Sequence, residues 1–253
     1  MPKSADSVLS FLDGNGNPVP EEALRSTYAK LLRTNGYVHL VDVPDTFDHV
    51  GFLRGFGDFL PSPTGTLVGD MVPEPGMDGI YHSGNQQALV PHTEGYDLDE
   101  LPARYLALWC VVPPSGEGGE TTLFDGFKLV NSLGEDERKH LETQTYTWSL
   151  AAGLQSQGMM YQAEHPVLET VDDELLLRFS YNNLRRPDGD ETVADFLERG
   201  KERFDAEHTA VRYRPGDLLH WDNWRMLHAR NAFEDPHRHL KRVMIRHRAP
   251  QTA

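Results

Sequence analysis

The C-terminal third of the chain restricts the fold most strongly, because it reads as a series of short strands with almost no helix between them. VRYRPGDLLHWDN (211–223) predicts a strand, a Pro-Gly-Asp turn and a second strand, and WRMLHARNAF (224–233) and LKRVMIRHR (240–248) predict two more. Consecutive strands joined by short turns do not form the alternating βαβ units of a parallel sheet. The pattern therefore favours a mainly β fold, a sandwich or barrel with flanking helices.

Helices are expected early in the chain and as insertions between strands. PEEALRSTYAKLLRTN (20–35) has an apolar stripe at helical spacing, and Gly36 follows at the position that ends a helix. Further helices are predicted over 46–60, 127–143 and 189–209, the last with Asp190 or Thr192 as the N-cap. Strands are predicted over 37–44, 104–112, 145–150 and 174–181 and from 121, and a Gly/Pro-rich surface loop over 61–79.

Composition places the chain among globular proteins with one large domain, residues 1–253. No stretch approaches the roughly 18 apolar residues of a membrane span, and the first residues lack the apolar core of a secretory signal, so we expect a cytoplasmic protein with no membrane partner. The single cysteine, Cys110, excludes an intrachain disulfide and a thiolate-rich zinc site, and its apolar surroundings predict a core position. The net charge of −15 argues against a nucleic-acid partner.

A histidine and a glutamate separated by one residue stand in LVPHTEGYDL (89–98). On a strand, His92 and Glu94 would point to the same face, about 6–7 Å apart along the backbone, and could converge on one ion. The alternative is a solvated acidic turn. Two histidines and one carboxylate, with open positions for a co-substrate and O₂, suit a non-haem Fe(II) oxygenase, so a third ligand must come from elsewhere in the fold.

Two arginines interrupt an apolar strand near the C-terminus. Arg242 and Arg246 share one face of LKRVMIR, and an unpaired guanidinium in an apolar interior is costly, so carboxylates are expected opposite them. Arginine also suits bidentate capture of a carboxylate better than lysine does. An exposed edge strand with solvated arginines is the alternative. Asp222 and Arg225 are expected to form an ion pair that braces the strand of His228.

Four segments together resemble the Fe(II)- and 2-oxoglutarate-dependent oxygenases of the taurine dioxygenase and clavaminate synthase group. They are HTE (92–94), GGETTLFDG (118–126), GDLLHWDNWRMLHAR (216–230) and LKRVMIR (240–246). Clavaminate synthase has the same His-Thr-Glu and a similar Asp-Asn-x-Arg-x-x-His-Ala-Arg run, whereas the short chain is closer in length to carbapenem synthase. The resemblance implies a double-stranded β-helix (a cupin-like jelly roll) with a lid or insert within about 127–209.

The resemblance also implies the roles of the site residues. His92, Glu94 and His228 would be the iron ligands and the catalytic centre. Arg242 matches the arginine that pairs with the distal carboxylate of 2-oxoglutarate, and Thr121 matches a threonine that hydrogen-bonds the same group. Glutamate at 94, where halogenating relatives have alanine or glycine, argues against halogenation.

Residues of a substrate site are assigned more loosely. Arg246 matches a position that in several relatives holds an acidic group of the substrate. Ser83, Asn85 and Asn182 are candidates to line the pocket, with a polar loop as the alternative for each. His220 is expected to be a packing residue.

The expected function is a dioxygenase with Fe(II), 2-oxoglutarate and O₂. It would oxidise, by default hydroxylate, an unactivated C–H bond of a small carboxylated, amino-acid-like metabolite and release succinate and CO₂. The same cofactor chemistry could instead serve desaturation, ring closure or epimerisation in natural-product biosynthesis. A metal-binding jelly-roll sensor without turnover is a further alternative, and the sequence does not indicate an oligomeric state.

Overall fold

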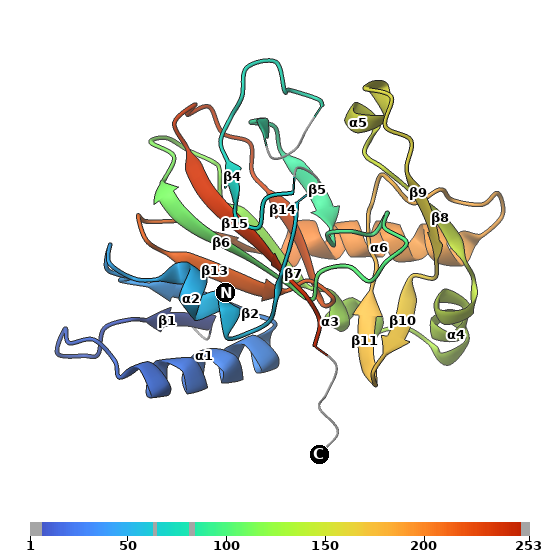
Figure 1. The fold of residues 1–253 in the computed structure, drawn as a ribbon. Coiled ribbons are helices and arrows are strands. Elements are labelled where there is room, and N and C mark those ends of the chain that lie inside the picture. The colour runs from blue at the N-terminus through green and yellow to red at the C-terminus, as the bar shows by residue number, and fades with distance from the viewer. Residues whose placement is uncertain (1–6, 63–64, 81–83, 249–253) are drawn as a thin grey trace.

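Two β-sheets form the centre of the computed structural model, which describes residues 7–62, 65–80 and 84–248 (Figure 1). The larger sheet has seven strands in the order β1-β2-β13-β6-β15-β3, with β4 also paired to β15. Its strands are β1 Val8–Ser10, β2 Tyr37–Val41, β3 Phe59–Leu60, β4 Gly69–Met71, β6 Tyr105–Val112, β13 Leu218–Asp222 and β15 His239–Ile245. The smaller sheet has the order β12-β7-β14-β5, with β5 Leu89–His92, β7 Thr121–Asp125, β12 Thr209–Val211 and β14 Met226–Arg230.

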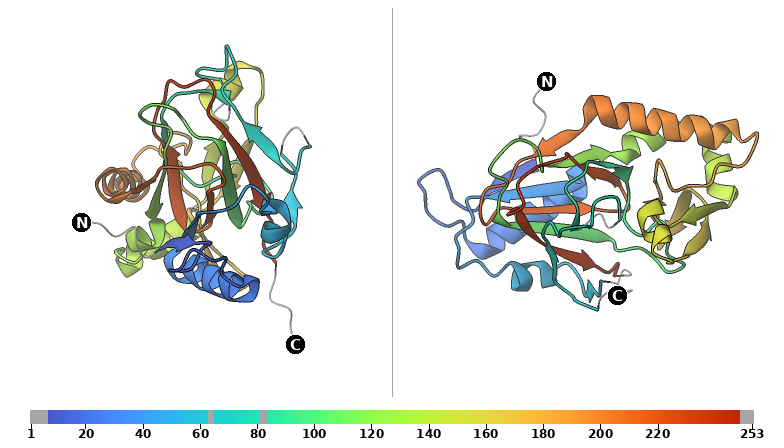
Figure 2. Two further views of the ribbon diagram at one scale, coloured as in Figure 1. Left: turned by 90° about the vertical axis from the view of Figure 1, so that its left-hand side faces the viewer. Right: turned by 90° about the horizontal axis from the view of Figure 1, so that it is seen from above.

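Helices and two hairpins surround the sheets. The helices are α1 Glu21–Asn35, α2 His49–Arg54, α3 Gly126–Val130, α4 Glu135–Thr143, α5 Ala152–Ser156 and α6 Glu191–Glu207. The hairpins pair β8 Tyr146–Ser149 with β9 Gln162–His165, and β10 Leu168–Val171 with β11 Glu174–Leu177. Figure 2 shows α1 and α6 on different sides of the sheets. Among the described residues, no helix is both long enough and apolar enough to cross a bilayer.

Strand alternation divides the apolar side chains into three clusters. On β6, Leu106 and Leu108 lie in a cluster between the two sheets, whereas Ala107 and Trp109 pack with α1 and α2 on the outer face of the larger sheet. On β7, Leu123 likewise faces the layer between the sheets, and the next residue packs outward against the α6 side. Because neighbouring strand residues point to opposite faces, β6 and β7 each supply side chains to two clusters.

The predicted mainly β fold with flanking helices is confirmed, and it is the double-stranded β-helix that the resemblance implied. The helix at 20–35 is present as α1, and Gly36 ends it at φ 79, which disfavours other residues. Asp190 caps α6 by accepting a hydrogen bond from the backbone N–H of Val193. Cys110 is buried in the layer between the sheets, as expected.

Four predicted elements have different bounds. The helix expected over 46–60 is only α2, because the chain continues as β3 paired with β15. The loop expected over 61–79 contains β4, which also pairs with β15. The helix expected over 127–143 is two helices, α3 and α4, with Gly134 as the N-cap of the second. The strand expected over 174–181 ends at Leu177, where β11 ends.

His220 illustrates the core of the outer cluster. Its imidazole is fully buried among the rings of Tyr28, Phe56 and Tyr105, and neither ring nitrogen has a hydrogen-bond partner among the described residues. The predicted packing role is therefore confirmed. Burial without a partner lowers the pKa of His220 to about 3, so the side chain is neutral near pH 7.

We expect His220 to make the fold sensitive to mild acid. The unfolded chain protonates this histidine below about pH 6.5, whereas the folded chain does not until about pH 3, so stability falls across that window. Between pH 7 and pH 5 the loss should be about 2 kcal/mol. Between pH 7 and pH 5, the free energy of unfolding of His220→Leu in urea should fall by about 2 kcal/mol less than that of the wild type. Leucine at the exposed His237 should leave the acid sensitivity of the wild type unchanged. Equal acid sensitivity of the wild type and His220→Leu would contradict this assignment.

Candidate metal centre

His228 faces the layer between the sheets. On β14 its neighbours Leu227 and Ala229 pack outward, so alternation turns Met226, His228 and Arg230 inward. The imidazole is buried and lies against Trp221, with ring centroids 5.1 Å apart. Burial, and after it the neighbouring His92 and Arg242, lowers the pKa of His228 well below its usual value, which leaves the ring neutral and able to bind a metal.

His92 ends β5, opposite His228 in the antiparallel pair. Their ring centroids are 4.2 Å apart. Nδ1 of His92 lies 2.9 Å from the carbonyl oxygen of Val90, and a ring N–H that donates there leaves Nε2 with its lone pair free. The register of one strand pair therefore brings together two residues separated by 136 positions.

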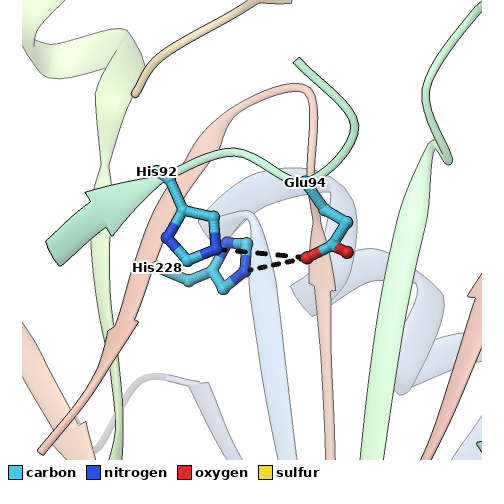
Figure 3. Close-up of side chains that lie close together, drawn as sticks. All are labelled: His92, Glu94 and His228. Carbon is cyan, nitrogen blue, oxygen red and sulfur yellow. Dashed lines mark ion pairs between the residues drawn. The ribbon is translucent and has the colours of Figure 1, made fainter. Parts of the chain in front are cut away.

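Glu94 completes the group from outside the strand. The sequence expectation that His92 and Glu94 share one strand face is wrong in detail, because β5 ends at His92 and Glu94 lies in the following turn. Its Oε2 nevertheless lies 4.0 Å from Nε2 of His92 and 3.9 Å from Nε2 of His228 (Figure 3).

The three side chains form a donor set that fits a transition metal. One ligand atom from each residue lies within 4.8 Å of the other two, and among the described residues this is the one such group of histidine, cysteine and carboxylate side chains. Two imidazoles and one carboxylate suit Fe(II). Nδ1 of His228 is buried without a partner among the described residues, so its position is set by packing and not by a hydrogen bond.

Arg242 reaches the same centre from the larger sheet. Leu240 lies in the layer between the sheets and Val243 packs outward, so Arg242 also points inward. Its Nη1 is 3.5 Å from Oε1 of Glu94, and its side chain is only 15% exposed. The expectation that a carboxylate would stand opposite this arginine is confirmed.

Thr121 faces the same layer as Leu123 and is buried. Its Oγ1 is 2.8 Å from the hydroxyl of Tyr213, which has no other hydrogen-bond partner among the described residues. If Tyr213 donates to Thr121, the proton of the threonine hydroxyl is free for an acceptor in the interior. Thr121 thus places a hydroxyl group between the sheets.

The remaining predicted residues lie in different surroundings. Arg246 follows β15 and is exposed, with no ion-pair partner among the described residues. Asn85 is buried, and its Oδ1 accepts from Arg230 at 2.6 Å. Asn182 is exposed at the edge of an open pocket, and Ser83 lies outside the described residues. Their roles stay predictions.

The expected ion pair between Asp222 and Arg225 is wrong. Arg225 pairs instead with Asp125, at 2.6 Å, and Asp222 pairs with Arg104, at 2.8 Å. Both partners lie about 100 residues or more away in sequence. Arg225 still braces the strand of His228, because Asp125 is opposite Met226 in the β7–β14 pair.

Two residues with clear roles in the geometry were not singled out from the sequence. The side chain of Asn223 hydrogen-bonds both backbone groups of Glu94. Arg230 donates from Nη2 to Asn85 and to the carbonyl oxygen of Gln87, and so holds the segment before β5. Both residues lie in the quoted run that also contains His228, but no local pattern names their distant partners.

The sequence profile described as "Taurine catabolism dioxygenase TauD, TfdA family" matches residues 14–244. The chain belongs to this family. The match to this dioxygenase family covers most of the chain, and the predicted cofactors, Fe(II) and 2-oxoglutarate, are those of the TauD/TfdA family.

Among curated relatives, γ-butyrobetaine dioxygenase from Homo sapiens is 26% identical over 154 residues, covering 56% of this chain and 39% of that enzyme. Pentalenolactone F synthase from Streptomyces arenae is 24% identical over 172 residues, covering 53% of each chain. The matched region thus spans about half or less of these relatives.

Solved structures support the fold. Asparagine oxygenase in complex with Fe(II), (2S,3S)-3-hydroxyasparagine and succinate superimposes with a TM-score of 0.70 at 22% identity, covering 91% of this chain and 80% of that chain. The non-haem iron oxygenase OrfP in complex with Fe and α-ketoglutaric acid gives 0.67 at 19% identity, with 90% and 81% covered. PvcB, an oxygenase from an isonitrile synthetic pathway, gives 0.62 at 21% identity, with 92% and 89% covered.

We expect a divalent metal to stabilise the fold through this centre. Metal at about 100 times its dissociation constant should add about 2.7 kcal/mol, which for a chain of this size raises Tm by about 5–10 °C. Thermal unfolding with and without Mn(II), after chelator treatment, measures this shift. His228→Ala should lose it, whereas Ala at the exposed His237 should keep it. The same shift in His228→Ala as in the wild type would place the metal elsewhere.

Proposed function

We propose that this oxygenase hydroxylates a C–H bond of a small, carboxylated, amino-acid-like substrate, with His92, Glu94 and His228 as its iron ligands. The observation that carries the proposal is the convergence of these three donors with Arg242 at one place, where His228 is buried and His92, Glu94 and Arg242 are partly exposed. When bound there, Fe(II) with 2-oxoglutarate and O₂ supplies the oxidising chemistry. The residues of the chain bind, orient and shield the reactants.

Arg242 and Thr121 would hold the distal carboxylate of 2-oxoglutarate. Both are on inward-facing strand positions, one on each sheet, and they offer a guanidinium and a hydroxyl donor. A carboxylate held by a largely buried guanidinium forms a strong, charge-assisted pair. Trp221 packs beside His228 and keeps that side of the centre apolar.

The substrate would occupy the space between the metal centre and the α5 side of the molecule. Ser180 pairs with His92 in an isolated bridge, and the residues that follow it border an open pocket of about 240 Å³. The pocket is lined by Ser149, Ala152, Gln155, Asn182, Asn183, Leu184 and Arg185. Asn183 also donates to the hydroxyl of Tyr96, two residues after Glu94, and so ties the pocket to the ligand segment.

The chemistry of this pocket favours some side chains over others. Its lining offers amides, a hydroxyl and one arginine but no carboxylate. Arg246 would take the α-carboxylate, since it is exposed and no acidic side chain among the described residues pairs with it. An amide or acidic side chain would therefore find hydrogen bonds in the pocket, whereas a guanidinium or ammonium would enter without a counter-charge.

The first experiment is substrate-independent turnover. Purified protein with Fe(II), ascorbate and 2-oxoglutarate should slowly release succinate, and Glu94→Ala should not. Absence of succinate from the wild type would overturn the proposed site and favour the alternative of a metal-binding jelly-roll protein without turnover.

A panel of free amino acids then tests the substrate class. We expect asparagine, glutamine, aspartate or glutamate to raise succinate formation at least about tenfold more than arginine or lysine does, because the pocket lacks a carboxylate. Mass analysis of the products distinguishes hydroxylation (one oxygen gained) from desaturation or ring closure (two hydrogens lost) and epimerisation (no mass change). Stimulation by arginine alone would contradict the proposed pocket.

The two arginines should separate kinetically. Arg242→Ala removes a charge-assisted pair of about 2–4 kcal/mol, so KM for 2-oxoglutarate should rise by about 30-fold to several hundred-fold in the uncoupled reaction. Arg246→Ala should leave that KM within about twofold and raise only the KM for the amino-acid substrate. Arg248→Ala, which removes an exposed arginine paired with Asp58, is the control. The reverse pattern would show that the two roles are exchanged.

A further inference from the structure

Glu94 lies just beyond strand β5, so the strand does not fix its backbone position. The hydrogen-bond ladder of β5 ends at His92, so the backbone of Glu94 needs another partner to hold a fixed position. On one side, Thr93 is held by Phe179, whose carbonyl oxygen accepts from the backbone N–H of Thr93 at 2.8 Å. The carboxylate ligand itself is therefore held by something outside the sheet.

That partner is the carboxamide of Asn223. Its Oδ1 accepts from the backbone N–H of Glu94 at 2.7 Å, and its Nδ2 donates to the carbonyl oxygen of Glu94 at 3.0 Å. Nδ2 also donates to the carbonyl oxygen of Ala103 at 2.9 Å. One side chain thus pairs with both backbone groups of the ligand residue, much as a neighbouring strand would.

Only an amide can make this set of bonds. Asparagine has one acceptor and two donor hydrogens at the end of a short side chain, whereas aspartate of the same shape has acceptors alone. Asn223 is only 1% exposed, so a replacement that leaves the groups of Glu94 without partners cannot rely on water. The geometry requires asparagine at this place.

The position of Asn223 links two metal ligands. It lies in the turn between β13 and β14, five residues before His228, and its own N–H donates to the carbonyl oxygen of Arg104. The hairpin that carries His228 inward therefore also holds the backbone of Glu94. We propose that Asn223 is a positioning residue that fixes the carboxylate of Glu94 in register with His228 for metal binding. The inference rests on the proposed metal centre.

The test is metal affinity measured on folded protein without turnover. Asn223→Asp keeps the shape of the side chain but removes both donors, and Asn223→Ser is the second variant in case a buried carboxylate prevents folding. Anaerobic titration with Co(II), followed by its visible absorption, should show at least about tenfold weaker binding and an altered spectrum. Trp224→Phe is the matched control, because it removes a buried hydrogen bond in the same turn, to Pro102, without touching Glu94.

A double-mutant cycle separates positioning from general damage. In a Glu94→Ala background the two histidines still bind Co(II) weakly, and Asn223→Asp should then have little further effect, because the group that it positions is gone. An equal loss of affinity in both backgrounds would show a purely structural role and overturn the proposal. So would wild-type affinity and spectrum in folded Asn223→Asp or Asn223→Ser. Failure of the wild type to bind Co(II) would instead contradict the metal centre itself.

Discussion

The site depends on strand alternation in two facing sheets. Each strand sends one set of side chains outward to the helices and the other into the layer between the sheets. A polar residue on an inward position is therefore held among apolar neighbours without any local device. His228 on one sheet and Arg242 on the other are such residues, and the facing of the sheets brings them to one place.

Polar groups in that layer reduce stability unless they have partners. Each inward arginine has a distinct one: Arg242 lies beside Glu94, Arg230 holds Asn85, and Arg238 donates to the carbonyl oxygen of Gly119. Burial lowers the pKa of Arg230 to about 10 and also lowers that of Arg238, which reflects the cost of desolvating two neighbouring cations. The folded state tolerates the desolvation of these arginines because each guanidinium has an oxygen acceptor. The other side chains that face this layer are mostly apolar.

Residue types and strand faces were predictable, whereas partners were not. The apolar neighbours of His228 and Arg242 indicated that these two side chains turn inward, because alternation is a local property. The HTE spacing named two residues that do meet, but the reason was wrong, because Glu94 lies outside β5. The partner of Arg225 depends on the β7–β14 register, and the sequence favoured the nearby Asp222 over the true partner, Asp125. The break between α3 and α4 was missed because one glycine within a helical pattern does not by itself end a helix.

Strand geometry does not set the position of Glu94 in the site. His92 and His228 are placed by one antiparallel pair, so their separation is fixed as soon as the register is. A third donor on the same ladder would face either the same layer further along or the outer helices, since strand positions recur every two residues. Because Glu94 lies outside the strand, its carboxylate can approach both imidazoles from the side. For the same reason its backbone lacks the strand hydrogen bonds that would fix its position. A buried amide from the His228 hairpin restores those bonds, so the geometry of the three donors depends on a contact between residues 129 positions apart.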